Sequence, residues 1–358
     1  MPKAITMQHI EGGKPGKVYY PLNLIDVPTP KPGPSDLIVE IHAAALNHRD
    51  FFLRQHLYPA PSFETPILAD GYGVVTSVGS AASKSWLGKK VILTPGRGWK
   101  EDPLAPETPY AILGGTKTFP LGTLQEVVVV DQDEVEEAPG HLSASEAAAL
   151  PLTGLTGWRA LVTKSGNAEK GRNILVTGIG GGVALNVLQF GVGLGINIYV
   201  TSGSQEKLDK AKALGAKGGV SYKDEAWEKE LKKQLPNDRP YLDAIIDGAG
   251  GPIISKAVRL LKAGGVVVQY GMTVGPKMDW LMSANLNHLE LRGSTMGSRK
   301  EFRDMVKFVN EKNIRPVVSR TVHGIDNLKD IDSLFEEMRN GSQFGKLVIE
   351  LGGTTSKL

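Results

Sequence analysis

The stretch that most constrains the fold runs from Asn173 to Thr201. It begins with the apolar run 173–177, passes through the glycine-rich turn 178–184 and a helical pattern, and ends with a second apolar run, 196–201. Strand, glycine turn, helix and strand in this order have the length of a βαβ crossover. Glycines at such a turn let the backbone approach a pyrophosphate, whose charge then lies at the N-terminus of the helix. The stretch therefore predicts a dinucleotide-binding unit.

The glycine spacing departs from the strict G-x-G-x-x-G pattern, because Val183 stands where the third glycine would be. Gly178, Gly181 and Ala184 instead keep small residues at every third position. A glycine motif alone is weak support, and the alternative is an ordinary buried strand and helix joined by a flexible turn. The strands on both sides favour the dinucleotide site, for which we expect contacts from Gly178, Gly181, Gly182 and Val183.

The whole chain predicts two domains, because it has 358 residues and a single core rarely grows past about 250–300 residues. The first part contains mostly short strands, as in a barrel-like β domain. Strands and helices then alternate, which predicts an α/β fold with a Rossmann-type, doubly wound parallel sheet. Ser143 and Glu146 have the spacing of a capping box at a helix start. The expected domains are 1–145 with 298–358, and 146–297.

Composition excludes several classes of partner. The net charge is +3 and no basic block is present, so we expect no nucleic-acid binding. No apolar stretch is long enough to cross a membrane, and the N-terminus has no signal sequence. The chain contains no cysteine, which excludes disulfides and thiolate metal sites and fits a reducing compartment. We therefore expect a cytoplasmic protein that acts on a small molecule.

The second strand of the central unit bears on the choice of nucleotide. NAD sites place Asp or Glu about 20 residues past the glycine turn, on the ribose hydroxyls. No acid occurs in 200–204, and Glu206 falls in the first turn of the next helix. Ser202, Ser204 and Lys207 are instead suited to a 2′-phosphate, although a lone lysine is more often a solvated helix residue. This pattern favours NADPH.

The order of the domains and several local patterns resemble the medium-chain dehydrogenase/reductase superfamily over essentially the whole chain. The patterns are Asn47-His-Arg-Asp50, Asp70-Gly-Tyr-Gly-Val-Val75, the stretch Leu150–Ala160, and Phe344-Gly-Lys346. The chain is most similar to the zinc-free, quinone-oxidoreductase-like branch, whose members are sometimes labelled alcohol dehydrogenases. The resemblance implies that the mostly-β domain is a GroES-like catalytic domain.

Departures from the zinc members argue against a metal. Those members carry Cys near position 47, where this chain has Asn47, and a Gly-His-Glu where it has Asp70-Gly71-Tyr72. The irregular stretch 96–118 stands where four cysteines usually build a structural zinc lobe. A catalytic zinc needs three protein ligands, and the seven histidines form no cluster in the sequence. We therefore expect no zinc. A loop as long as 96–118 is usually functional or disordered.

The expected chemistry follows from the missing metal. Hydride delivery to a simple ketone puts full charge on oxygen, which metal enzymes stabilise with a Lewis acid. A quinone or an α,β-unsaturated aldehyde or ketone spreads that charge. We therefore expect hydride transfer from NADPH to a conjugated carbonyl, with the protein orienting the reactants. The alternatives are an enoyl-thioester reductase and a weakly catalytic NADPH-binding redox sensor.

The resemblance also implies roles for individual residues. Asn47 would hold the nicotinamide end or donate to the substrate oxygen, and Thr156 would bond the carboxamide. His48 takes the place of a proton-relay histidine, and Tyr58 is the better candidate for the proton donor. The ordinary alternatives are a satisfied turn Asn for Asn47 and a helix Thr bonded to its own backbone for Thr156. Asp50 is expected to be structural.

Further cofactor contacts are expected from residues at the ends of later strands. Tyr222 and Lys346 match positions that bind the 2′-phosphate in the branch resembled, and Tyr270 and Gly271 complete the expected set. Residues 285–292 are expected to form an edge strand that pairs across a twofold axis, as members of this superfamily often do. This predicts a homodimer.

Overall fold

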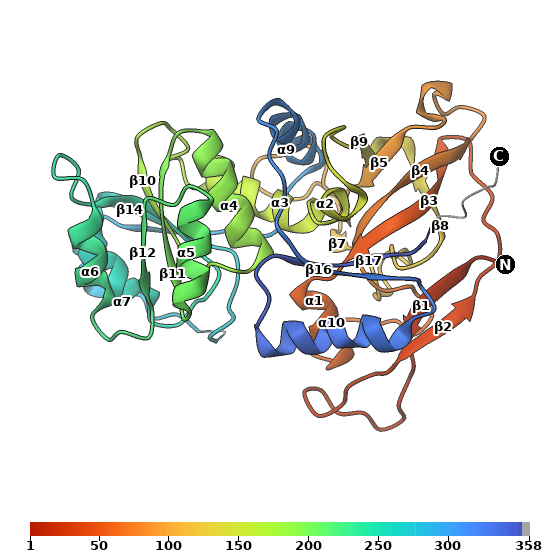
Figure 1. The fold of residues 1–358 in the computed structure, drawn as a ribbon, viewed down its shortest axis with the longest axis horizontal. Coiled ribbons are helices and arrows are strands. Elements are labelled where there is room, and N and C mark those ends of the chain that lie inside the picture. Colours follow the sequence, from red (N-terminus) through yellow and green to blue (C-terminus); the bar gives the residue numbers. More distant parts are fainter. Residues whose placement is uncertain (276, 353–358) are drawn as a thin grey trace. The chain divides into compact units, whose positions relative to one another are not determined.

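The computed structural model describes residues 1–275 and 277–352. The chain divides into two compact units. Unit 1 comprises Met1–Leu152 and Ser298–Leu358, and unit 2 comprises Thr153–Gly297. Figure 1 follows the chain through both units by colour.

The first boundary between the units differs from the expected 145/146. Helix α2 (Ala144–Ala148) packs against two strands of unit 1, β3 (Asp36–Ala45) and β4 (Asp70–Val78). The start of α2 has the expected capping box, in which Ser143 Oγ accepts the backbone N–H of Glu146 and the Glu146 carboxylate accepts the backbone N–H of Ser143. Helix α2 therefore belongs with unit 1, and the boundary lies after it.

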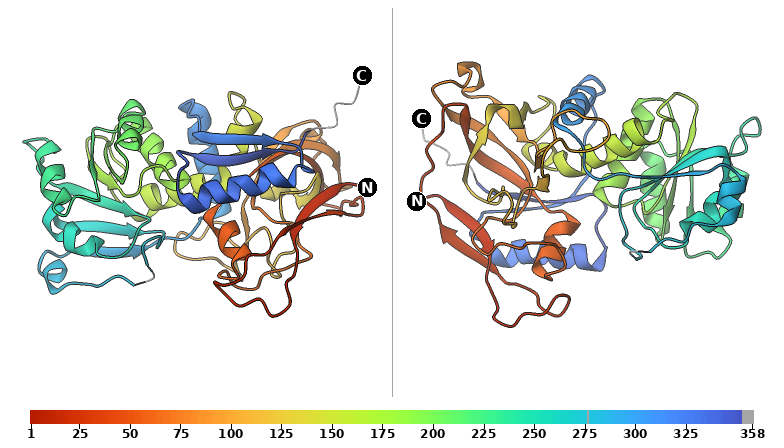
Figure 2. Two further views of the ribbon diagram at one scale, coloured as in Figure 1. Left: turned by 60° about the horizontal axis from the view of Figure 1, so that its bottom comes forward. Right: turned by 180° about the vertical axis from the view of Figure 1, so that it is seen from behind.

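Unit 1 is built mainly from antiparallel strands. Besides α2, β3 and β4, its elements are β1 (Lys3–Met7), β2 (Leu22–Asp26), α1 (His48–Arg54), β5 (Lys90–Leu93), β6 (Gly96–Arg97), β7 (Ala111–Ile112), β8 (Val127–Asp131), β9 (Val135–Glu137), α9 (Arg299–Glu311), β16 (Val318–His323), α10 (Leu328–Asn340) and β17 (Lys346–Glu350). Within the described ranges the main sheet has seven strands, in the order β16-β17-β3-β4-β5-β9 with β8 also paired to β3. Alternate residues of β3 are buried, as expected for a strand with one face on a core. Helix α10 packs against β16 and β17 (Figure 2).

Two carboxylates order part of the stretch 96–118. Glu107 accepts the backbone N–H groups of Lys100, Glu101 and Asp102, at 2.7, 2.7 and 2.8 Å. These hydrogen bonds lower the pKa of Glu107 to about 2, so the carboxylate is ionised at neutral pH. The short strands β6 and β7 pair with each other and close the base of the stretch. Asp102 Oδ1 in turn accepts the backbone N–H of Leu104 at 2.7 Å, so two acidic side chains organise the turn at 100–104.

Unit 2 is the expected doubly wound parallel sheet. Its elements are α3 (Pro151–Trp158, which begins in unit 1), a π-helical turn (Arg159–Lys164), β10 (Asn173–Val176), α4 (Gly182–Gly193), β11 (Asn197–Ser202), α5 (Gln205–Ala213), β12 (Gly218–Ser221), α6 (Trp227–Gln234), β13 (Leu242–Asp247), α7 (Ile253–Leu260), β14 (Leu261–Gln269), α8 (Met282–Leu286) and β15 (Glu290–Gly293). The strands of the described part are all parallel, in the order β12-β11-β10-β13-β14-β15. This is the strand order of a classic dinucleotide-binding sheet, whose order reverses between β10 and β13.

Helices cover both faces of this sheet (Figure 1). Tyr199 packs in one apolar cluster with Trp227 of α6 and Ile254 of α7. A Cβ at Gly191 of α4 would meet the side chain of Ile198, and neighbouring residues of a strand point to opposite faces. Gly191 therefore lets α4 approach the other face closely. Among residues 1–275 and 277–352, no helix combines the length and apolarity needed to cross a bilayer.

The segment expected to form an edge strand, 285–292, is only partly a strand. Helix α8 ends at Leu286, and β15 begins at Glu290. His288 between them has a positive φ of 53°, which marks a turn rather than extended backbone. Strand β15 is nevertheless the last strand on its side of the sheet in the part of the chain described.

A buried carboxylate gives unit 2 a testable dependence on pH. Asp243 of β13 accepts hydrogen bonds from Arg239, Lys262 and the backbone N–H of Asn173. Burial alone would raise its pKa, but these bonds lower the pKa to about 2. Because the pKa of an unfolded Asp is higher, the carboxylate stabilises the fold above about pH 4, and this stabilisation is lost as the pH falls toward 2.

We expect Asp243→Asn to lower the free energy of unfolding at pH 7 by about 1–3 kcal/mol. Urea unfolding at pH 7 and at pH 3 measures the effect, and the difference from the wild-type protein should shrink at the lower pH. Asp209→Asn on the exposed side of α5 is the control and should change little at either pH. A loss that is equal at both pH values would contradict the assigned role.

Candidate functional site

Three segments of unit 1 that are far apart in the chain meet at one buried polar cluster. Strand β17 pairs antiparallel with β3, with Val348 opposite Ala45, so Lys346 and Asn47 lie just beyond that pair. Strand β4 pairs with the other side of β3 and begins at Asp70, also opposite Ala45. The register of the sheet therefore brings Asn47, Asp70 and Lys346 together.

The cluster is held by short hydrogen bonds. Lys346 Nζ donates to Asn47 Oδ1 at 2.6 Å and to Asp70 Oδ2 at 2.7 Å. Asn47 Nδ2 donates to Asp70 Oδ2 at 3.0 Å, and the backbone N–H of Leu152 donates to Asp70 Oδ1 at 2.7 Å. Asn47 is 5% exposed, Asp70 0% and Lys346 4%. Burial of this ion pair is tolerated because both charges are paired and hydrogen-bonded.

Lys346 has a different environment from the one that the resemblance implied. As a ligand of a 2′-phosphate, its ammonium would have to be open to the nucleotide. The structure instead buries the ammonium within unit 1 against Asn47 and Asp70. We therefore no longer count Lys346 among the expected phosphate ligands and assign it to the buried cluster.

The cluster does not suit a zinc ion. Zinc in proteins is held mainly by Cys sulfur and His nitrogen, whereas the side chains here are an amide, a carboxylate and an ammonium. Asn47 Oδ1 and Asp70 Oδ2 already accept hydrogen bonds from the positively charged ammonium group of Lys346. Across the described ranges, no group of three or more His, Cys, Asp or Glu side chains is placed to hold a metal.

Helix α1 begins at this cluster and carries His48. The ring of His48 lies in contact range of Phe52 one turn later, at 6.3 Å between centroids. Part of His48 is exposed, but neighbouring atoms displace water from its ring. This burial lowers the pKa of His48, and so does the positive charge of Lys346. His48 is therefore neutral at neutral pH and can accept a proton.

Asp50 and Arg49 support the start of α1, as expected of a structural pair. The backbone N–H of Asn47 donates to Asp50 Oδ2 at 2.8 Å, and Arg49 Nη1 donates to Asp50 Oδ1 at 2.9 Å. Arg49 also donates to the carbonyl oxygens of Leu113 and Gly114. These bonds tie the helix that carries Asn47 to the end of the 96–118 stretch.

Tyr58 lies beside this pair. The guanidinium carbon of Arg49 is 4.8 Å from the centroid of the Tyr58 ring, a distance at which the cation and the ring attract each other. Tyr58 therefore lies in unit 1 beside Arg49, which donates to Asp50 at the start of α1. No contact in the structure tests its role as a proton donor, which stays a prediction.

In unit 2, the glycine turn has the conformation that its sequence requires. Gly178 and Gly180 have φ values of 66° and 128°, which favour glycine. Gly181 has an ordinary φ of −77° and is the N-cap of α4, and a Cβ built there would meet nothing within 4 Å. The turn is tied to β11 by the hydrogen bond from Gly178 N to Thr201 Oγ1, at 3.1 Å. Gly181 therefore stands next to open space at the N-terminus of α4, as a pyrophosphate site needs, and Gly182 and Val183 begin the helix there.

The end of β11 brings the expected phosphate-binding residues together. Ser204 caps α5, with its Oγ 3.4 Å from the backbone nitrogen of Lys207, and its own N–H donates to Ser202 Oγ. A Cβ built at Gly203 would lie 2.6 Å from the hydroxyl of Tyr222. The Tyr222 hydroxyl therefore crosses over Gly203, beside both serines.

Lys223 lies with Tyr222 beside Gly203, and the sequence did not identify it as a site residue. Its Cε would lie 3.1 Å from a Cβ built at Gly203, next to the hydroxyl of Tyr222. The only signal available was that it follows Tyr222 directly. The side chain is exposed, and its position shows that a lysine reaches this end of β11.

Tyr270 and Gly271 lie at the ends of β13 and β14. The Tyr270 hydroxyl packs against Gly248, and burial raises the pKa of Tyr270. A Cβ at Gly271 would lie 2.8 Å from the carbonyl oxygen of Gly248, so glycine is needed there. Nearby, Thr177 Oγ1 donates to Asp247 Oδ1 at 2.5 Å and joins the carboxyl ends of β10 and β13, where doubly wound sheets bind their ligands.

Thr156 of α3 has a hydroxyl that lies 3.5 Å from the sulfur of Met296 in unit 2. The residue is 6% exposed. This contact leaves the expected bond to a carboxamide untested.

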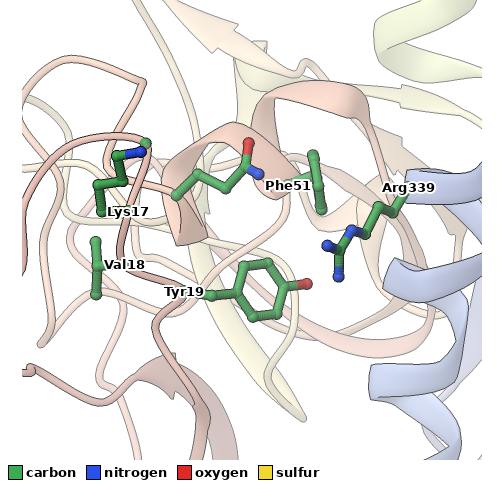
Figure 3. Close-up of a pocket in the computed structure, with 7 residues that line it drawn as sticks. Lys17, Val18, Tyr19, Phe51 and Arg339 are labelled. Carbon is green, nitrogen blue, oxygen red and sulfur yellow. The ribbon is translucent and has the colours of Figure 1, made fainter.

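The small cavity shown in Figure 3 lies in unit 1 and is partly lined by Phe51 of α1. It has a volume of about 160 Å³ and is lined by Gly16, Lys17, Val18, Tyr19, Phe51, Gln55 and Arg339. The Tyr19 hydroxyl points toward the Arg339 guanidinium in the figure. None of the expected site residues lines this cavity, so it gives no support to the site.

Two family models match different parts of the chain. The model of the alcohol dehydrogenase GroES-like domain matches residues 33–140, in unit 1. The model of the zinc-binding dehydrogenases matches residues 182–311, most of them in unit 2.

Known proteins are similar over almost the whole length. A zinc-type alcohol dehydrogenase-like protein, YogA, of Leptosphaeria maculans is 56% identical over 98% of this chain and 100% of its own. Acryloyl-coenzyme A reductase of Metallosphaera sedula is 26% identical over 90% of this chain and 95% of its own. A crystal structure described as an NAD-dependent alcohol dehydrogenase is 30% identical, with a TM-score of 0.84, and the match covers 98% of this chain and 100% of that one.

Proposed function

Because the chain belongs to the medium-chain dehydrogenase/reductase superfamily, we propose that it is an NADPH-dependent oxidoreductase that acts without zinc. Its substrate would be a conjugated carbonyl compound, either a quinone or an α,β-unsaturated aldehyde or ketone. The observation that carries the proposal is the group of hydroxyls and amines around Gly203, with no acid in 200–204. Bound NADPH would supply the hydride.

The coenzyme preference is supported by charge. Lys223 lies next to Gly203 at the end of β11, and Lys207 is in the first turn of α5. Both would face a 2′-phosphate there, together with Ser202, Ser204 and Tyr222. An acid at this point would bind the ribose hydroxyls of NAD and repel a phosphate. The similar crystal structure is described as NAD-dependent, so NADH is the alternative that a binding experiment must exclude.

Independence from zinc is supported by the side chains at Asn47. The buried cluster there supplies hydrogen-bond donors and an internal ammonium rather than metal ligands. Stabilisation of the developing charge on a substrate oxygen would therefore come from donors. A conjugated acceptor needs less stabilisation, because the acceptor itself spreads the charge. His48, neutral at neutral pH, would pass a proton, and Tyr58 would deliver one.

A second candidate is reduction of an enoyl thioester. It is favoured by the similarity to acryloyl-coenzyme A reductase, which is 26% identical. The two candidates share hydride transfer to a carbon conjugated with a carbonyl group and differ in what is attached to that carbonyl. The cytoplasmic location and the lack of nucleic-acid partners stay predictions from composition.

Removal of the side-chain charge of either Lys207 or Lys223 should weaken the binding of NADPH but not that of NADH. We expect Lys207→Gln and Lys223→Gln to raise the Kd for NADPH by about 10-fold or more, since each removes a charged hydrogen bond to phosphate, and to leave the Kd for NADH unchanged. Calorimetric titration with both nucleotides measures this. Lys210→Gln, one turn further along α5 and paired with Glu206 at 2.6 Å, is the matched control. NADH binding as tight as NADPH in the wild-type protein would refute the preference.

A substrate panel separates the candidate functions. Quinones, enals, enoyl thioesters and saturated aldehydes are offered with NADPH in the presence of a metal chelator, and oxidation is followed at the nicotinamide absorbance. We expect turnover of quinones or enals and little of saturated aldehydes. Tyr58→Phe should lower turnover by about 100-fold and leave the Kd for NADPH unchanged, whereas Tyr19→Phe should leave both unchanged. Turnover abolished by the chelator would contradict the proposal, and full activity of Tyr58→Phe would remove Tyr58 as the donor.

We also propose a homodimer formed along β15. Exposed apolar side chains accompany this edge strand: Met282 is 70% exposed, Leu286 75% and Leu291 43%. An exposed apolar edge of this kind favours pairing with a second copy. Light scattering should give the mass of a dimer for the wild-type protein and for Leu104→Glu, whose leucine is 78% exposed in unit 1, and the mass of a monomer for Leu286→Glu. A monomeric wild-type protein would refute the dimer.

A further inference from the structure

The side-chain amide of Asn47 has one orientation that its neighbours allow. Its Oδ1 lies 2.6 Å from Lys346 Nζ, and its Nδ2 lies 3.0 Å from Asp70 Oδ2. An ammonium group only donates hydrogen bonds, and an ionised carboxylate only accepts them. If the amide turned over, its NH2 group would face the ammonium and its oxygen would face the carboxylate. Both contacts would be repulsive, so the ion pair determines which end of the amide points where.

The fixed orientation limits what Asn47 can bind. Its carbonyl oxygen faces Lys346, and Asp70 accepts one of the two hydrogens on Nδ2. The second hydrogen on Nδ2 is therefore the donor that Asn47 can offer to a ligand. A partner for that hydrogen must be an acceptor, such as a carbonyl oxygen.

Lys346 is itself held rigidly. Its ammonium is 2.7 Å from Asp70 Oδ2, and the other carboxylate oxygen accepts the backbone N–H of Leu152 at 2.7 Å. The backbone oxygen of Asp70 accepts the hydroxyl of Thr123 at 2.7 Å. Because Lys346 begins β17, which pairs with β3 next to Asn47, its backbone is fixed by the sheet as well. The ammonium therefore has little freedom to leave the amide.

We infer that Lys346 is a positioning residue whose ammonium, anchored by Asp70, fixes the amide of Asn47 as a hydrogen-bond donor toward a carbonyl oxygen. The inference rests on the proposed function for the identity of that carbonyl, which belongs either to the conjugated substrate or to the carboxamide of the coenzyme. It adds that a ligand group that meets Nδ2 of Asn47 must accept a hydrogen bond. It also gives Lys346 a role in unit 1 in place of phosphate binding.

The test measures the amide directly and needs no substrate. In the full-length protein labelled with ¹⁵N, the Asn47 side-chain signals are assigned by their loss in Asn47→Ala, and the exchange of the Nδ2 hydrogens with water is followed by NMR. We expect one hydrogen to exchange slowly in the wild-type protein and in Lys90→Ala, whose lysine is exposed on β5. In Lys346→Ala it should exchange at least about 10-fold faster. Propylammonium, which restores the missing ammonium, should slow it again, whereas the uncharged propanol should not.

A kinetic measurement separates positioning from mere support of the fold. With the substrate that the panel identifies, we expect Lys346→Ala to lower kcat/KM by about 100-fold, the effect expected of a misplaced catalytic group. The Kd for NADPH should stay unchanged if the carbonyl belongs to the substrate and should rise if it belongs to the carboxamide of the coenzyme. Propylammonium should restore activity over the same concentration range as it restores slow exchange.

Several results would overturn the inference. One is fast exchange of both Nδ2 hydrogens in the wild-type protein, and another is wild-type exchange in Lys346→Ala. A third is a fall in kcat/KM with exchange unchanged. Lys346→Ala could unfold because Asp70 is left unpaired, and in that case the double variant Asp70→Asn/Lys346→Ala replaces it, since it removes both charges. The double variant should show fast exchange of the Nδ2 hydrogens. Slow exchange in the double variant would count against the inference. If no compound in the panel is reduced but the exchange results hold, the proposed function fails and the positioning role of Lys346 stands.

Discussion

A buried ammonium group holds the functional end of unit 1 together. Lys346 joins Asn47 and Asp70, and through them the end of β3, the start of β4 and the start of β17. Two opposite charges can remain away from water here because each has its hydrogen-bonding partners. Loss of one charge would leave the other buried and unpaired, so the geometry of Asn47, at the start of α1, depends on the complete cluster.

The two units contribute different chemistry. Unit 2 places glycines, hydroxyls and amines at the carboxyl ends of parallel strands, where backbone N–H groups and positive charge suit phosphates. Unit 1 supplies an amide of fixed orientation, a neutral histidine and a tyrosine beside Arg49. The positive charge in the buried cluster of unit 1 is that of a lysine paired with Asp70. In the 96–118 stretch, the carboxylate of Glu107 accepts three backbone N–H groups.

Sequence patterns predicted much of this molecule correctly where the interactions are local. The βαβ unit at 173–201 and the capping box of Ser143 and Glu146 depend on residues close together in the chain, and the doubly wound sheet is built by repeating such βα units. The first domain boundary was placed too early, because the packing of α2 on β3 and β4 is a contact between distant segments. The break between α8 and β15 was missed as well, since a turn at His288 has no strong sequence signal.

The sequence by itself determined the order of strands and helices, the glycine turn and the lack of an acid after β11, because spacing and residue type decide these features. Only the tertiary structure decided the environment of Lys346 and the approach of Lys223 to Gly203. For a lysine near the end of a chain, the sequence does not distinguish contact with a phosphate from contact with water or a carboxylate. Its partner is chosen by strand register and burial, which arise only when distant segments pack together.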